Sequence, residues 1–132
     1  MIIHSEQEML DFGKNFELTS NVVELIGDVG AGKTTFVRGL ADGLGIKEPV
    51  TSPSFMISKT YALPSGGNLV HYDFYRLNEP GLMVDDFAEN ITNPKNIVVV
   101  EWGESVKDLL PNNHQTICIN YNDDGSREVE VK

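Results

Sequence analysis

The sequence has one cysteine, no long apolar run and few basic residues. Because Cys118 is the single cysteine among 132 residues, no disulfide can form within the chain. No apolar segment approaches the roughly 20 residues that a membrane-spanning helix needs. The first residues, Met1 to Ser5, lack the basic and apolar regions of a signal peptide. These absences favour a reducing cytoplasm over secretion or a membrane.

Basic residues are half as frequent as acidic ones, 10 against 20, which gives a formal net charge of -10. Proteins that bind nucleic acid directly are usually basic, because phosphate contacts dominate their affinity. If this protein works on RNA, we therefore expect a partner to hold the RNA. The hydrophobic content of 40% is typical of a folded globular protein, and the length fits one domain over residues 1–132.

Periodicity and turn residues predict a mixture of helices and strands. Ser5 and Glu8 form a capping box at the start of an amphipathic helix that runs to about Phe16. Apolar runs predict a buried strand over Val22–Ile26 and a central one over Ile97–Val100. The remaining expected elements are a helix over Lys33–Leu44, a hairpin of Phe55–Leu63 and Asn68–Phe74, short helices near Leu82–Phe87 and Ser105–Leu110, and a hairpin of Thr116–Tyr121 and Arg127–Val131. This pattern predicts an α/β fold with both parallel and antiparallel strands.

One segment matches a phosphate-binding pattern. Gly27-Asp28-Val29-Gly30-Ala31-Gly32-Lys33-Thr34 fits GxxxxGK[ST] and lies between a predicted strand and a predicted helix. Its glycines let the backbone curl, so that successive N–H groups and the positive end of the helix face phosphate oxygens. Lys33 is placed to bridge the β- and γ-phosphates, and the Thr34 hydroxyl to ligate Mg²⁺.

An accidental lysine in a glycine-rich turn is the alternative, but the strand, loop and helix context favours a nucleoside triphosphate site. This context also specifies the fold as a three-layer domain of the P-loop NTPase type. The residues expected to bind the nucleotide are Asp28, Val29, Gly30, Ala31, Gly32, Lys33, Thr34 and Thr35.

A triphosphate site also needs acidic side chains near the magnesium ion. Glu101 directly follows the apolar run Ile97–Val100, and Asp73 lies near the end of the strand before it. We expect Glu101 to bind the metal together with Thr34, and both acids to serve catalysis. A surface carboxylate at the edge of the sheet is the alternative for each, and the sequence does not separate their roles.

A hydroxyl-rich loop, Thr51-Ser52-Pro53-Ser54-Phe55, follows the helix of the phosphate-binding motif. Such a loop can place a threonine on Mg²⁺ or on the γ-phosphate, although a plain turn fits the spacing equally well. His71 is more typical of a packed structural residue than of a general base. Trp102 could cover the site, but burial is the default for a lone tryptophan. Arg76 could equally reach a phosphate or form a salt bridge.

Taken together, four blocks of sequence resemble the TsaE family, also called YjeE. They are Gly27–Thr35, Thr51–Phe55, His71–Leu77 and Val100–Glu104. The resemblance implies a small bacterial P-loop ATPase that binds ATP and Mg²⁺, hydrolyses ATP slowly and supports threonylcarbamoyladenosine modification of tRNA. It implies TsaD and TsaB homologues as partners, with TsaD performing the transfer and tRNA reached only through that complex.

The resemblance also implies phosphate and magnesium roles for Lys33 and Thr34, a switch-like loop at Thr51, and functional acids at Asp73 and Glu101. Some positions depart from the family. Gly103 replaces a frequent proline, Ser54 replaces a frequent threonine, and the tail after Pro111 diverges.

Two other functions stay open at this stage. One is a small P-loop kinase, which would need an acceptor pocket and usually an arginine-bearing lid. This chain has three arginines, Arg38, Arg76 and Arg127, and no evident lid. The other is a nucleotide-gated binding module whose hydrolysis is incidental. Adenine as the base is an expectation from the resemblance alone.

Overall fold

The chain folds around one mixed sheet, seen in a computed structural model that describes residues 1–28, 30–53, 57–75 and 82–132. The elements are β1 (Ile2–Ile3), α1 (Glu6–Lys14), β2 (Val22–Ile26), α2 (Lys33–Gly43), β3 (Ser58–Ala62), β4 (Asn68–Asp73), α3 (Leu82–Thr92), β5 (Ile97–Glu101), the 3-10 helix η1 (Gly103–Leu109), β6 (Gln115–Tyr121) and β7 (Arg127–Val131). The strand order is β1-β7-β6-β2-β5-β4-β3. The strands β6, β2, β5 and β4 run parallel, whereas β1, β7 and β3 pair antiparallel with their neighbours. The predicted α/β fold with a mixed sheet is confirmed.

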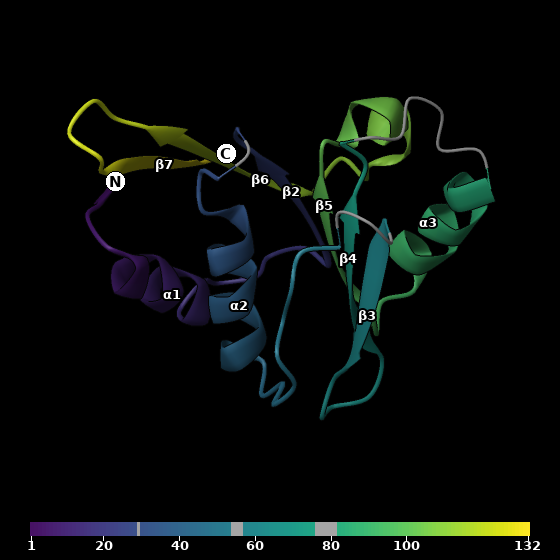
Figure 1. Ribbon diagram of the computed structural model, residues 1–132. Helices are drawn as coiled ribbons and strands as arrows, with labels where there is room; N and C mark the ends of the chain where they lie inside the picture. Colours follow the sequence, from purple (N-terminus) through teal and green to yellow (C-terminus); the bar gives the residue numbers. More distant parts are fainter. Residues whose placement is uncertain (29, 54–56, 76–81) are drawn as a thin grey trace.

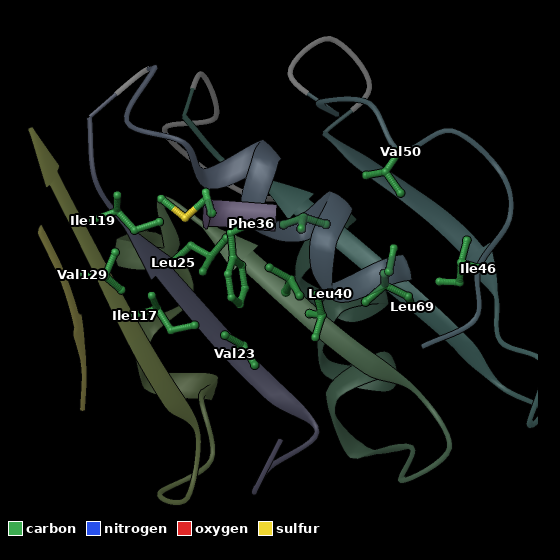
Figure 2. Packing of buried hydrophobic residues seen from close by; sticks show 14 of the residues in the cluster. Val23, Leu25, Phe36, Leu40, Ile46, Val50, Leu69, Ile117, Ile119 and Val129 are labelled. Carbon is green, nitrogen blue, oxygen red and sulfur yellow. The ribbon is translucent and has the colours of Figure 1, made fainter. Parts of the chain in front are cut away.

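Helices cover both faces of the sheet and make three layers (Figure 1). On one face Val23 and Val99 pack under α1 and α2, and on the other Val98 and Val100 pack under α3 and η1. Figure 2 shows Phe36 of α2 pointing into the first of these layers. Because β5 is buried on both faces, its sequence is a continuous apolar run, as a central parallel strand requires. Within the described residues, no helix is long and apolar enough to cross a bilayer.

The first helix begins where the capping box predicted. The Ser5 hydroxyl accepts a hydrogen bond from the Glu8 backbone N–H at 3.1 Å, while the Glu8 carboxylate accepts one from the His4 N–H at 3.3 Å. The helix ends at Lys14, slightly before the predicted Phe16. Phe16 still packs on Phe36, with ring centroids 5.5 Å apart. The cap and the aromatic contact together fix α1 on α2.

The helix on the opposite face is longer than predicted. A short helix was expected over Leu82–Phe87, whereas α3 continues to Thr92. Phe87 and Ile91, four residues apart, both bury against the sheet, and this contact sustains the second half of the helix. Tyr72 of β4 anchors α3 by donating to Asp86 at 2.5 Å. Burial, with this hydrogen bond, raises the pKa of the Tyr72 phenol above its ordinary value.

A short edge strand was not predicted from the sequence. β1 pairs antiparallel with β7, and the pairing places Ile3 opposite Arg127. Two residues are too few to show the alternation that marks a strand. The pairing matters for the site, because it brings the N-terminal segment beside the β6–β7 hairpin (Figure 1).

The backbones of α1 and α2 touch at glycines. A Cβ added to Gly39 would lie 2.2 Å from the Leu10 carbonyl oxygen, and one added to Gly13 would lie 2.3 Å from the Phe36 carbonyl oxygen. Real Cβ atoms essentially never approach so closely, and the obstructing atoms belong to helix backbone. The helix pair can therefore reach this separation only with glycine at both positions.

We predict that Gly39→Ala destabilises the protein by about 1–3 kcal/mol, the usual cost of overpacking a close contact. The sign of the change in unfolding free energy is informative. Without the close contact the substitution should stabilise the helix, because alanine is intrinsically favoured over glycine there by about 0.5–1 kcal/mol. Urea unfolding measures the change. Asp42→Ala is the control, since Asp42 is exposed on the same helix and its side chain pairs with the exposed Lys14 at 3.6 Å. A Gly39→Ala variant as stable as the parent would contradict the close contact.

Candidate functional site

Three parallel strands end at one edge of the sheet and carry the predicted site residues. The phosphate-binding motif follows β2, Asp73 is the last residue of β4 and Glu101 is the last residue of β5. In the register Glu101 lies between Leu25 of β2 and Asp73 of β4. The carboxyl ends of parallel strands are where α/β sheets bind ligands.

The phosphate-binding loop has the backbone that the motif predicts. Gly30 and Gly32 have φ angles of 82° and 111°, in the left-handed region where only glycine is unstrained. Gly32 is also the N-cap of α2, and the first turn of that helix carries no acidic residue. The positive end of α2 therefore faces the loop with no carboxylate in its own first turn. Val29 lies outside the described residues, and Asp28 is exposed, with its carbonyl accepting from the Ala31 N–H at 3.0 Å.

The Lys33 side chain is buried although it is charged, with 5% of its surface exposed. Its ammonium donates to the Gly27 carbonyl and lies 3.7 Å from Glu101 Oε1. It also lies 4.5 Å from the centroid of the Trp102 ring. A buried cation is tolerated only when it is paired in this way. The charge is thereby held between the loop and the acid.

The two predicted acids share one pocket with the loop. Glu101 is 3% exposed, and its Oε2 lies 2.5 Å from His71 Nε2. Asp73 Oδ1 accepts a hydrogen bond from the Tyr75 N–H at 3.0 Å. The pocket has a volume of about 290 Å³ and is lined by Gly30, Gly32, Lys33, Thr34, Thr35, Ser52, Asp73, Tyr75, Glu101 and Trp102. Apart from Asp28, Ala31 and Thr51, all predicted site residues in the described part of the chain therefore meet here.

Thr51 is not among the residues that line this pocket. Its hydroxyl accepts a hydrogen bond from Lys59, and it borders a separate hollow beside Arg38 and Asp42. The neighbouring hydroxyl, Ser52, lines the acidic pocket instead. Ser54, Phe55 and Arg76, which the sequence also singled out, lie outside the described residues.

The structure corrects the expectation for Trp102. A buried tryptophan was predicted, whereas Trp102 is half-buried, lines the pocket and packs on Tyr75 with ring centroids 4.8 Å apart. Its φ of 57° is uncommon for a residue with a side chain. His71 is packed as predicted, but it packs against the acid of the site and not merely within the core. A lone histidine in a strand gives no signal that identifies its distant partner.

A second pocket adjoins the first across the loop. It has a volume of about 340 Å³ and shares Gly30, Gly32 and Thr35 with the acidic pocket, and Ala31 lines it too. Its other lining residues come from the N-terminal segment and the β6–β7 hairpin, namely Ile3, His4, Ser5, Glu6, Met9, Gly125 and Arg127. The two pockets therefore border the same phosphate-binding loop.

The β6–β7 hairpin also holds the loop from outside. Arg127 Nε donates to the Ala31 carbonyl at 3.0 Å, and the Tyr121 hydroxyl donates to the Gly30 carbonyl. The Arg127 guanidinium stacks 3.8 Å from the centroid of the Tyr121 ring. Sequence reasoning missed both residues, because about ninety positions separate them from the loop and no local pattern marks such a contact.

The oxygen donors of the acidic pocket suit magnesium. No group of three or more His, Cys, Asp or Glu side chains that could hold a metal occurs in the described part of the chain. The pocket offers the Thr34 hydroxyl and the carboxylates of Asp73 and Glu101. Mg²⁺ prefers such hard oxygen ligands, and it usually takes only one or two carboxylates together with waters and substrate phosphates.

The chain is similar over nearly its whole length to proteins of one family. The family model described as "Threonylcarbamoyl adenosine biosynthesis protein TsaE" matches residues 3–129. The tRNA threonylcarbamoyladenosine biosynthesis protein TsaE of Treponema pallidum is 41% identical over 111 residues, covering 84% of this chain and 81% of that protein. The TsaE protein of Haemophilus influenzae is 34% identical over 137 residues, covering 98% and 85%. The crystal structure of Bacillus subtilis YdiB matches with a TM-score of 0.75 at 32% identity, covering 98% of this chain and 80% of that one.

We predict that Tyr121→Phe loosens the phosphate-binding loop without unfolding the protein. The loss of one hydrogen bond of about 1 kcal/mol should speed amide exchange at Gly32 and Lys33 about fivefold. Hydrogen exchange followed by NMR measures the effect. Tyr61→Phe is the control, because the Tyr61 hydroxyl contacts the Thr51 N–H at 3.3 Å, outside the loop. Equal loop exchange in the Tyr121 variant and the parent would show that the hairpin does not hold the loop.

Proposed function

This chain belongs to the TsaE family, and we propose that in tRNA threonylcarbamoyladenosine biosynthesis it is the subunit that binds ATP with Mg²⁺ and hydrolyses it slowly. The observation that carries the nucleotide part is the buried Lys33 ammonium, held between the loop carbonyl of Gly27 and the Glu101 carboxylate. TsaB and TsaD homologues as partners rest on the family resemblance. Contact with tRNA only through that complex fits the formal net charge of -10.

The two adjoining pockets suggest how a nucleotide would lie. The loop between them would receive the phosphates on its backbone N–H groups and on the helix end. The terminal phosphate would then face Glu101 and Asp73, and the nucleoside would occupy the pocket beside Arg127. A planar guanidinium already stacked on an aromatic ring is suited to pack against a base.

Each residue of the acidic pocket then has a role. Lys33 would neutralise phosphate oxygens, and bound Mg²⁺, held by Thr34 and Glu101, would supply further charge neutralisation. Asp73 would orient the attacking water, since the Tyr75 N–H fixes its carboxylate. Trp102 would cover the site and limit the entry of bulk water.

The charges around this pocket support the proposal of slow turnover. Lys33 is the only cationic side chain among the described residues that line it. Fast phosphoryl transfer usually requires a second cation, often an arginine that reaches the transferred phosphate. Turnover measured alone and with TsaB and TsaD homologues separates an ATPase subunit from a binding module with incidental hydrolysis. Transfer of phosphate to a metabolite in place of water would favour a kinase.

We predict that Lys33→Met weakens ATP binding about 10- to 100-fold, equivalent to one charge-assisted hydrogen bond of about 1.5–3 kcal/mol. Methionine keeps the apolar stem and removes the charge that faces the phosphates. Isothermal titration calorimetry with ATP and MgCl₂ measures the change. Lys47→Met is the matched control, because Lys47 is exposed beyond the other end of α2. Unchanged affinity in the Lys33 variant would reject the phosphate site.

We propose that Thr51 acts as a switch residue, which requires its hydroxyl to leave Lys59 and turn into the acidic pocket when nucleotide binds. Thr51→Ala should then lower turnover roughly tenfold, about 1.4 kcal/mol of transition-state stabilisation, whereas Thr51→Ser should stay near the parent rate. Phosphate release under saturating ATP measures both. If Ser52→Ala is impaired and Thr51→Ala is not, the role belongs to Ser52, which already lines the pocket.

A further inference from the structure

A buried histidine contacts the carboxylate at the centre of the site. His71 lies on β4, paired with Val99 of β5 on one side and Lys59 of β3 on the other. Its side chain has no exposed surface, and its Nε2 lies 2.5 Å from Glu101 Oε2. The backbone of His71 is therefore paired on both sides, and its buried imidazole lies against the acid.

The surroundings of the ring determine which nitrogen carries the proton. His71 Nδ1 is buried and has no hydrogen-bond partner among the described residues. A proton on Nδ1 would leave an N–H group buried and unpaired, and would set the Nε2 lone pair against the carboxylate. A proton on Nε2 donates to Glu101 and leaves only an unpaired acceptor. The geometry therefore favours the tautomer with the proton on Nε2.

Because of this hydrogen bond, the two Glu101 carboxylate oxygens face different partners. The terminal torsion of a glutamate is soft, so a carboxylate without such a bond would sample many orientations. His71 holds Oε2, which leaves Oε1 on the side of Lys33, 3.7 Å from the ammonium. Carboxylates that bind metals are commonly held by such outer hydrogen bonds.

We propose that His71 is a positioning residue that orients Glu101 so that Oε1 faces Mg²⁺ and the terminal phosphate. This inference rests on the proposed function, because it assigns a partner to the acid of that site. A role in packing alone explains the contact less well. An aliphatic side chain would fill the same space without burying an unpaired nitrogen, so the imidazole costs stability that only its hydrogen bond offsets.

The test compares the parent with His71→Leu, His71→Gln and Leu69→Val. Leucine removes the donor, whereas the glutamine amide can restore it. Leu69, two residues away on the same strand and fully buried, reports what a packing change alone does. Trp102 is the only tryptophan and lines the pocket, so its fluorescence follows ADP binding in EDTA and across a series of MgCl₂ concentrations.

In His71→Leu we expect the MgCl₂ concentration for half-maximal effect to rise about tenfold or more, with ADP affinity in EDTA changed less than about twofold. His71→Gln should recover most of the loss, and Leu69→Val should resemble the parent. A folded His71→Leu variant with the parent's Mg²⁺ requirement would overturn the proposal. So would a glutamine variant as impaired as the leucine one, or an equal shift in Leu69→Val.

A second measurement needs no variant and no nucleotide. Nitrogen-15 NMR of the imidazole in the parent protein should place a proton on His71 Nε2. An Nε2 without a proton would overturn the proposal even if His71→Leu fails to fold. The outcomes also distinguish a failure of the proposed function from a failure of the positioning role. A parent that binds no ADP rejects the proposed function and the positioning role together. A parent that binds ADP with Mg²⁺ dependence unchanged in His71→Leu rejects the positioning role alone.

Discussion

The ion pair between Lys33 and Glu101, 3.7 Å apart and almost fully buried, is the interaction on which the site depends. Lys33 is the first residue of α2, directly after the loop that follows β2, and Glu101 is the last residue of β5. The pair therefore links the segments that follow and end two neighbouring parallel strands. Burying two charges usually costs about as much free energy as their attraction returns, so the pair contributes little to stability. Its presence is better explained by ligands that would share these charges.

Strained backbone conformations lie next to Asp73 and Glu101, the two acids of the pocket. Among the described residues other than glycine, positive φ angles occur at Ile57 and Trp102, with values of 68° and 57°. The Ile57 carbonyl accepts the Asp73 N–H at 2.7 Å, and Trp102 directly follows Glu101. Such conformations cost on the order of 1–3 kcal/mol each and persist where surrounding contacts impose them. At Trp102 the strained backbone sets the ring over the Lys33 ammonium.

The sequence could predict the parts of the site that depend on residues close together along the chain. The phosphate-binding loop is continuous in sequence, and the apolar run before Glu101 identifies it as the end of a central strand. The fold class follows from the same alternation of helices and strands. Boundaries were less accurate, because the length of α3 depends on Phe87 and Ile91 meeting the other face of the sheet.

The parts that sequence could not predict depend on contacts between distant segments. The hydrogen bond from His71 to Glu101 crosses from β4 to β5, and that from Arg127 to Ala31 joins the last hairpin to the loop. Thr51 and Ser52 both carry a hydroxyl, so residue type does not distinguish them. Only the path of the backbone decides which one lines the acidic pocket. In each case the contact depends on where a side chain points in the folded protein, which residue type and spacing do not specify.

The charge distribution bears on the proposal that this protein binds the nucleotide and that a partner holds the tRNA. At the loop, the positive end of α2 and the Lys33 ammonium act over a few ångströms. In the proposed function they would attract the phosphates, while Mg²⁺ would offset the carboxylates of Asp73 and Glu101. A tRNA approaching the surface meets the formal net charge of -10 first. Salt screens charges over about 8 Å, which weakens that repulsion at a distance but not at contact. The acidic surface therefore fits the proposed function, in which this protein would bind the nucleotide and a partner would hold the RNA.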